Sequence, residues 1–161
     1  MNAFIRKTSW GVADYLASVM SIILLFWAVS PLYYPASDWI VLNKVTAFDA
    51  KAGDEIILKI NRELLQGTFY GRYEVEVRTY PDNIHICTAR RSVNYVDTAK
   101  LEIDVERPLD WWAYSTDGEC VRWVPTAGQY YVTTRHCWHG AWWARESCNP
   151  MNKSNVFTVY D

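Results

Sequence analysis

The chain has 161 residues, of which 50% are hydrophobic and 21% are charged, and its formal net charge is −2. This composition is typical of a folded protein with a sizeable core and excludes an intrinsically disordered chain. The 16 basic and 18 acidic residues are interspersed, which argues against a nucleic-acid-binding protein, because such proteins need a concentrated basic surface. The length leaves room for one domain and a small additional segment.

An apolar segment, YLASVMSIILLFWAVSPLYY, runs without a charge from residue 15 to residue 34. A helix of this length crosses the ~30 Å hydrocarbon core of a bilayer. Arg6 and Lys7 precede the segment, whereas only Asp38 is charged between its end and Lys44. Basic residues before the span and not after it predict that the N-terminus is cytoplasmic and that the remainder of the chain lies outside.

Aromatic residues at the external end of the span are expected to lie at the membrane–water interface, where their amphipathic rings are favoured; they are Tyr33, Tyr34 and Trp39. A cleaved signal peptide is an alternative, since Ala28 and Ser30 have the small-residue spacing of a cleavage site. However, Pro31 would follow the cut, which processing disfavours. A buried core helix is a second alternative, but so long an uncharged stretch is unusual for one.

The expected organisation is therefore a single-pass signal-anchor protein. Residues 1–12 form a cytoplasmic N-terminus, residues 13–35 the transmembrane anchor, and residues 36–161 an extracytoplasmic domain. In a bacterial source the anchor would lie in the inner (cytoplasmic) membrane and the domain in the periplasm.

After residue 40 the hydrophobic pattern changes to period two, which predicts strands with one buried face. We expect a mainly β domain, an antiparallel immunoglobulin-like sandwich without a soluble helix. Tyr130, at the start of a late strand, occupies the place of a tyrosine corner, whereas the Cys…Trp…Cys spacing of antibody domains is absent. The expected strands are residues 41–48, 55–64, 71–80, 84–89, 99–106, 119–124, the later part of 125–138, and 154–161.

The four cysteines allow three disulfide pairings. Cys137 and Cys148 flank a turn at Gly140, so a local bridge between them is sterically easy. This leaves Cys87 to pair with Cys120. Two disulfides suit an oxidising, extracytoplasmic compartment.

Clustered tryptophans are the most distinctive feature of the external part. Trp111 and Trp112 are adjacent, and on a strand they could not both point inward. Exposed indoles would serve as anchors for a protein partner or as platforms for sugars, whereas buried ones would pack the core. The predicted docking patch consists of Trp111, Trp112, Trp138, Trp142 and Trp143.

Catalytic and metal sites are not expected. A metal site of His85, His136 and His139 lacks a carboxylate at a helpful offset, and the nearby cysteines are expected to be oxidised. No nucleophile elbow or triad frame is recognisable, and Glu74 and Glu76 are interpreted as solvated acids on one strand face. We therefore expect no enzyme activity and no cofactor. Five arginines could form a basic face, but a solvated surface is the favoured interpretation; they are Arg62, Arg72, Arg78, Arg90 and Arg91.

A short N-terminus and one anchor are followed by the strand-and-turn motifs VTAFDAKAGDEI (45–56), GRYEVEVR (71–78), LDWW (109–112), AGQYYV (127–132) and NVFTVY (155–160). In this arrangement the chain resembles small, uncharacterised single-pass membrane proteins of phages and prophages. The resemblance covers most of the chain and implies an extracytoplasmic sandwich, but it supplies no catalytic residues.

These observations predict a membrane-anchored, non-enzymatic interaction module. Its partners would be the lipid bilayer and either an envelope protein or a second copy of the chain, and not nucleic acid. If it is phage-encoded, its tasks would be lysis regulation, superinfection exclusion or envelope modification. The alternatives are a structural component of a virion or envelope assembly, and an envelope sugar-binding protein or enzyme.

Overall fold

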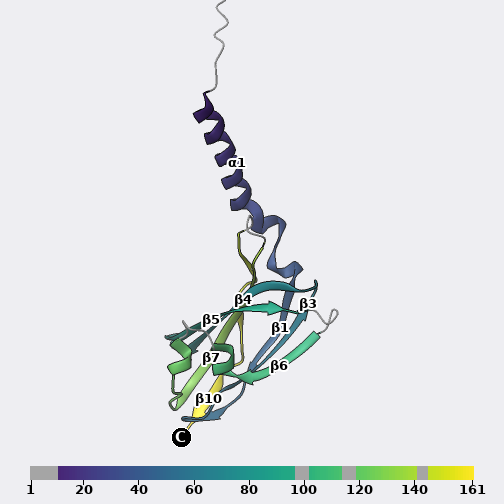
Figure 1. Cartoon of the computed structure of the whole chain (residues 1–161). Helices are drawn as coiled ribbons and strands as arrows, with labels where there is room; N and C mark the ends of the chain where they lie inside the picture. Colours follow the sequence, from purple (N-terminus) through teal and green to yellow (C-terminus); the bar gives the residue numbers. More distant parts are fainter. Residues whose placement is uncertain (1–10, 97–101, 114–118, 141–144) are drawn as a thin grey trace, which may run out of the picture.

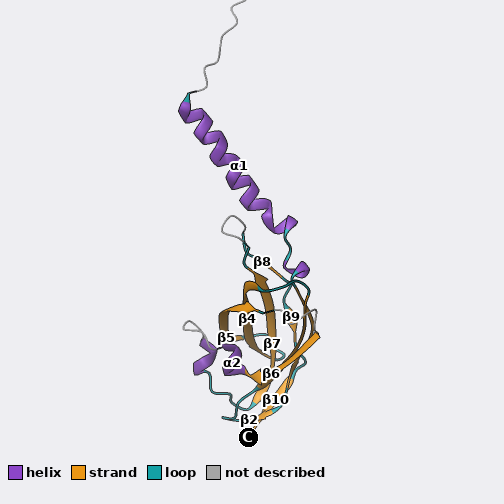
Figure 2. Ribbon diagram, turned by 45° about the vertical axis from the view of Figure 1, so that its right-hand side comes forward, coloured by secondary structure: helices purple, strands orange, loops and turns teal. Residues whose placement is uncertain are grey.

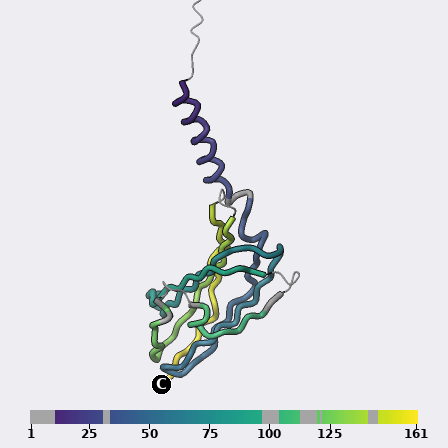
Figure 3. The backbone as a smooth tube through the Cα atoms, viewed as in Figure 1, coloured from purple at the N-terminus to yellow at the C-terminus, as the bar shows by residue number. Residues whose placement is uncertain are grey.

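The computed structural model describes residues 11–96, 102–113, 119–140 and 145–161; the side chains at 31–33, 102–103, 113, 119 and 121 are not described. It is mainly β, with an apolar N-terminal helix that projects from a domain built of two sheets (Figure 1). The C-terminus lies at the end of the domain that is farthest from the helix (Figure 3).

Helix α1 (Val12–Tyr33) contains the predicted apolar segment. It begins at Gly11, whose backbone N–H donates to the Asp14 carboxylate at 3.1 Å, a contact that satisfies one of the free donors at a helix N-terminus. The stretch Val12–Ser30 is long and apolar enough to cross a membrane, and only Ser30, at its end, is buried. Membrane anchors and signal sequences share this length and composition. The helix ends before Pro35, and a 3₁₀ turn, η1 (Ala36–Asp38), leads into the domain.

The smaller sheet has three antiparallel strands in the order β1-β3-β6. These are β1 (Ile40–Ala47), β3 (Ile57–Leu64) and β6 (Glu102–Pro108).

The larger sheet has the strand order β2-β10-β7-β4-β5, and two short strands, β8 and β9, also pair with β7. Its pairs are antiparallel except for β10 with β2, which is parallel. The long central strands β4 and β7 pair from Gly71 opposite Trp138 to Thr79 opposite Tyr130. The strands are β2 (Ala50–Lys51), β4 (Phe69–Thr79), β5 (His85–Tyr95), β7 (Gly128–Trp138), β8 (Ser147–Cys148), β9 (Asn152–Lys153) and β10 (Phe157–Tyr160).

The main hydrophobic core takes side chains from both sheets. Leu58 and Ile60 of β3, Val75 and Val77 of β4, and Val132 of β7 all have no exposed surface. In each strand these residues alternate with more polar ones, and the period-two pattern therefore buries one face of each sheet. A second, smaller cluster near the helical end of the domain contains Ala36, Ile40, Leu64, Phe69, Tyr95 and Trp138.

Two sequence predictions of local structure were wrong. Residues 109–113 form a short helix, α2 (Leu109–Ala113), although no helix was expected in the domain. Residues 119–122 form a 3₁₀ helix, η2 (Glu119–Arg122), where a strand over 119–124 was expected. Pro108 ends β6, and the spacing of Leu109 and Trp112 puts both on one face of α2, where they are 5% and 0% exposed. Packing of this face against the core explains why the segment turns into a helix.

Candidate functional site

The predicted docking patch is only partly exposed. Trp112 is 0% exposed and packs edge-to-face against Tyr73 in the core, with ring centroids 5.3 Å apart. Trp138 is 6% exposed and stacks on Trp39 at 4.8 Å. Assigning these two tryptophans to the patch was wrong, because their rings are buried against other aromatic side chains and cannot contact a partner. Trp111 is 37% exposed, while Trp142 and Trp143 lie outside the described residues.

Trp111 is the centre of an exposed site on α2. The guanidinium groups of Arg91 and Arg107 lie 5.2 Å and 5.9 Å from its ring centroid, within the range of cation–π attraction. The Trp111 carbonyl accepts hydrogen bonds of 3.3 Å from the Tyr73 hydroxyl and from Arg91. A depression of about 450 Å³ adjoins the ring. We call this site the α2 surface; it comprises Arg91, Arg107, Pro108, Asp110 and Trp111.

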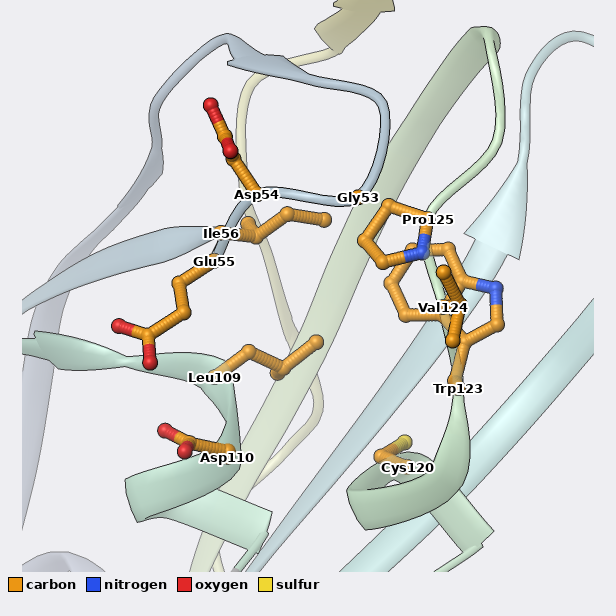
Figure 4. Close-up of a pocket in the computed structure, with 10 residues that line it drawn as sticks. All are labelled: Gly53, Asp54, Glu55, Ile56, Leu109, Asp110, Cys120, Trp123, Val124 and Pro125. Atoms are coloured by element: carbon orange, nitrogen blue, oxygen red, sulfur yellow. The ribbon is translucent and has the colours of Figure 1, made fainter.

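A smaller pocket of about 140 Å³, which Asp110 also lines, lies between α2 and η2. In Figure 4 the side chains of Ile56 and Leu109 point toward the ring of Pro125 across the pocket, and Trp123 and Val124 complete that wall. The remaining lining residues are Gly53, Asp54, Glu55, Asp110 and Cys120.

The carboxylates at this pocket are on its rim, where Glu55 and Asp110 lie on the same side (Figure 4). Neither forms an ion pair within the described part of the chain. Pockets for small-molecule ligands typically measure about 300–1,000 Å³, so a pocket of this size suits one inserted side chain better than a metabolite. Its apolar walls and acidic rim match a side chain with an apolar stem and a positive end.

The disulfides pair as predicted. Cys87 of β5 is bonded to Cys120 of η2, and Cys137 of β7 to Cys148 of β8. The first bridge attaches η2, and with it the pocket wall at Trp123, to the larger sheet. The second joins residues directly opposite each other on two paired strands. Although Cys137, Cys148 and Glu146 lie close together, both sulfurs are bonded to each other and are not free to act as thiolate ligands.

The three histidines have different partners. His85 Nε2 contacts the Thr88 hydroxyl at 2.7 Å, and His139 Nε2 lies 3.1 Å from Glu146. His136 is fully buried, and its Nδ1 is hydrogen-bonded to the Tyr95 hydroxyl. Burial, reinforced by the positive charge of Arg62, lowers the pKa of His136 well below its usual value. Within the described residues these histidines do not form a joint ligand set.

Glu74 is not the solvated acid that its strand pattern predicted. It is 1% exposed, and its carboxylate is paired with Arg90 and Arg135. Glu76 is paired with Arg78, and Arg72 with Glu146. Most arginines of the expected basic face therefore have an acidic or aromatic partner, including Arg62, which lies over the Tyr95 ring.

The segment that follows α1 contacts the domain through aromatic side chains. Tyr34 lies 5.9 Å from Trp138, and Trp39 contacts both Trp138 and Phe69. Trp39 thus helps to pack the domain. The prediction that placed Trp39 at the membrane–water interface missed this role, because the residues that Trp39 contacts are distant in sequence. Among the other predicted flanking residues, Arg6 and Lys7 and the side chain of Tyr33 lie outside the described part.

No family model matches the sequence, and no curated protein matches it either.

Proposed function

We propose that this protein is a membrane-tethered, non-enzymatic interaction module. The observation that carries the proposal is α1, an unburied apolar helix that leads through a short turn into a disulfide-bonded β domain. Exposing this much apolar surface to water is unfavourable, and a bilayer removes that cost.

The β domain is proposed to lie outside the cytoplasm. Arg6 and Lys7 precede the apolar segment, and basic residues are retained on the cytoplasmic side of a membrane. The pairing of all four cysteines is consistent with an oxidising compartment such as the periplasm. Under this proposal the source membrane is a bacterial inner membrane and the protein acts at the envelope, as the phage-type resemblance implies.

The proposed docking site is the α2 surface with the adjoining pocket. Aromatic and arginine side chains contribute most of the binding energy at protein interfaces, and Trp111 is an exposed ring with two arginines within cation–π distance of it. Its position on α2 is fixed from below by buried Trp112 and Leu109. Such a fixed side chain loses little conformational entropy when it binds a partner.

The immunoglobulin-like subtype of the domain is part of the same proposal. The Tyr130 hydroxyl, at the start of β7, donates to the Thr126 carbonyl at 3.0 Å. This backward hydrogen bond to the preceding corner is the geometry of a tyrosine corner. Interaction domains with this type of sandwich are common on cell surfaces.

The docking proposal can be tested by placing a photo-crosslinking amino acid at Trp111 or, as the control, at Phe48, another exposed aromatic residue. Discrete products that form in intact membranes at Trp111 and not at Phe48 are expected. A Trp111→Ala variant should reduce co-purification of the same partner at least tenfold while its melting temperature falls by no more than about 4 °C. Equal products at both positions, or undiminished co-purification, would contradict the docking site.

A further inference from the structure

The segment before β8 is attached to the last turns of α1. The backbone N–H of Arg145 donates to Ser30 Oγ at 2.8 Å, and Ser30 Oγ in turn donates to the Trp27 carbonyl at 2.8 Å. Nearby, the Ala36 N–H donates to Ser147 Oγ at 3.0 Å. Figure 2 shows β8 at the end of the domain that faces α1. These bonds place Arg145 beside the external end of the apolar helix.

The guanidinium of Arg145 lies over the ring of Trp27, 5.5 Å from its centroid. It forms no ion pair within the described residues, although other charges at this end of the domain do. Arg72 is paired with Glu146 at 2.7 Å, and Glu146 also contacts His139. The nearby acid Glu146 is therefore already paired, and Arg145 has no acidic partner among the described residues.

If α1 spans a bilayer, the position of Trp27 along the helix determines how deep the Arg145 guanidinium lies in the membrane. The inference therefore rests on the proposed function. Trp27 lies three positions before Ser30, the last residue of the apolar stretch, which corresponds to a rise of roughly 4.5 Å along the helix. The interfacial layer on each side of the hydrocarbon core is about 5–7 Å thick. The guanidinium of Arg145 therefore lies about one helical turn inside the end of the apolar stretch, from where its long side chain can extend to the phosphates of the lipid headgroups.

We propose that Arg145 binds the phosphate of a phospholipid in the leaflet next to the β domain. A guanidinium offers paired N–H donors that match phosphate oxygens. The Trp27 ring supports one face of the guanidinium and leaves its N–H edge available for the headgroup. The contact would fix the end of the domain that carries β8 against the membrane.

The proposal can be tested by solid-state NMR on the full-length protein in phosphatidylcholine bilayers, with ¹³Cζ-labelled arginine and ³¹P dephasing. All samples carry Arg6→Gln, because Arg6 precedes the span and could contact phosphates of the other leaflet. We expect ³¹P to dephase an arginine ¹³Cζ signal, and we expect this dephasing to be absent in Arg145→Gln. It should persist in Arg107→Gln, the matched control, because Arg107 also lies over a tryptophan but on the α2 surface.

A second sample replaces the phospholipid with a phosphate-free galactolipid and adds inorganic phosphate. No dephasing is expected there, and dephasing in it would show that Arg145 takes free phosphate, which overturns the headgroup assignment. Correct insertion is checked separately by sedimentation with the bilayer after alkaline carbonate. Inserted protein without dephasing refutes the Arg145 contact alone, whereas failure to sediment refutes the membrane proposal on which it rests.

Discussion

The carboxylate of Glu74 lies between the guanidinium groups of Arg90 and Arg135 in the larger sheet. Its two oxygens are 2.8 Å and 2.7 Å from the respective Nη2 atoms, and the three residues face one another on the adjacent strands β5, β4 and β7. Burial opposes ionisation of Glu74, but hydrogen bonds from Arg135 and Arg90 outweigh it, and the pKa of Glu74 is lowered.

We expect Glu74→Ala to lower the free energy of unfolding by about 2 kcal/mol. Breaking a fully buried ion pair costs about 3–5 kcal/mol, but the arginine side chains here are 57% and 33% exposed, so water partly replaces the lost partner. The control is Glu76→Ala, because the Glu76 carboxylate is 17% exposed, against 1% for Glu74, and has a single arginine partner; its loss should cost less than about 1 kcal/mol. Denaturant unfolding in detergent measures both, and equal losses would contradict the special role of Glu74.

Glu74 also predicts an acid-sensitive step in stability. Because its pKa is lower in the folded than in the unfolded chain, its contribution is complete above the unfolded value of about 4.5 and is lost as pH falls through the folded value. Thermal melts between about pH 5 and pH 3 should show this loss in the wild type. The loss should be smaller in Glu74→Gln, and an identical profile would count against the prediction.

His136 predicts a second step at higher pH. It is neutral in the folded chain because its pKa is lowered, whereas the unfolded chain takes up a proton below about pH 6.5. Stability should therefore be complete above about pH 6.5 and fall by up to about 1.4 kcal/mol per pH unit as acid is added. In His136→Phe this slope should disappear between about pH 6.5 and pH 5, while His85→Gln, at an exposed site, should retain it.

The adjacent tryptophans of α2 should differ sharply on substitution. Trp112→Ala removes a fully buried ring, and such a change costs about 3–5 kcal/mol of stability. Trp111→Ala should cost less than about 1 kcal/mol, because its ring is partly in solvent. Denaturant unfolding of the two variants checks this, and a large loss for Trp111 would mean that its ring is structural.

Most of what was predicted about the fold came from the period-two strand pattern and from the spacing of the cysteines. Residues 71–80 alternate in hydrophobicity over the length of β4, and local spacing was enough to pair Cys137 with Cys148. The short helix α2 was missed because no helix was expected in the domain, although the three-residue spacing of Leu109 and Trp112 is helical.

The candidate site depends on contacts between residues that are far apart in the sequence, and the local hydrophobic pattern does not indicate such contacts. Glu74 looks like a solvated acid in sequence and becomes buried only because β5 and β7 each bring an arginine to it. Trp138 is covered by Trp39, about a hundred residues earlier, and the pocket wall at Trp123 is positioned by the Cys87–Cys120 bridge. Burial of such residues follows from the strand order, which period-two patterning does not specify.

The membrane tether is tested most directly by the intact mass of the protein extracted from membranes of its expressing cells. Retention in the pellet after alkaline carbonate, with a mass corresponding to the full 18.7 kDa chain, is the predicted result. A soluble product that begins after α1 would show that the helix is a removed signal sequence and would contradict the tether.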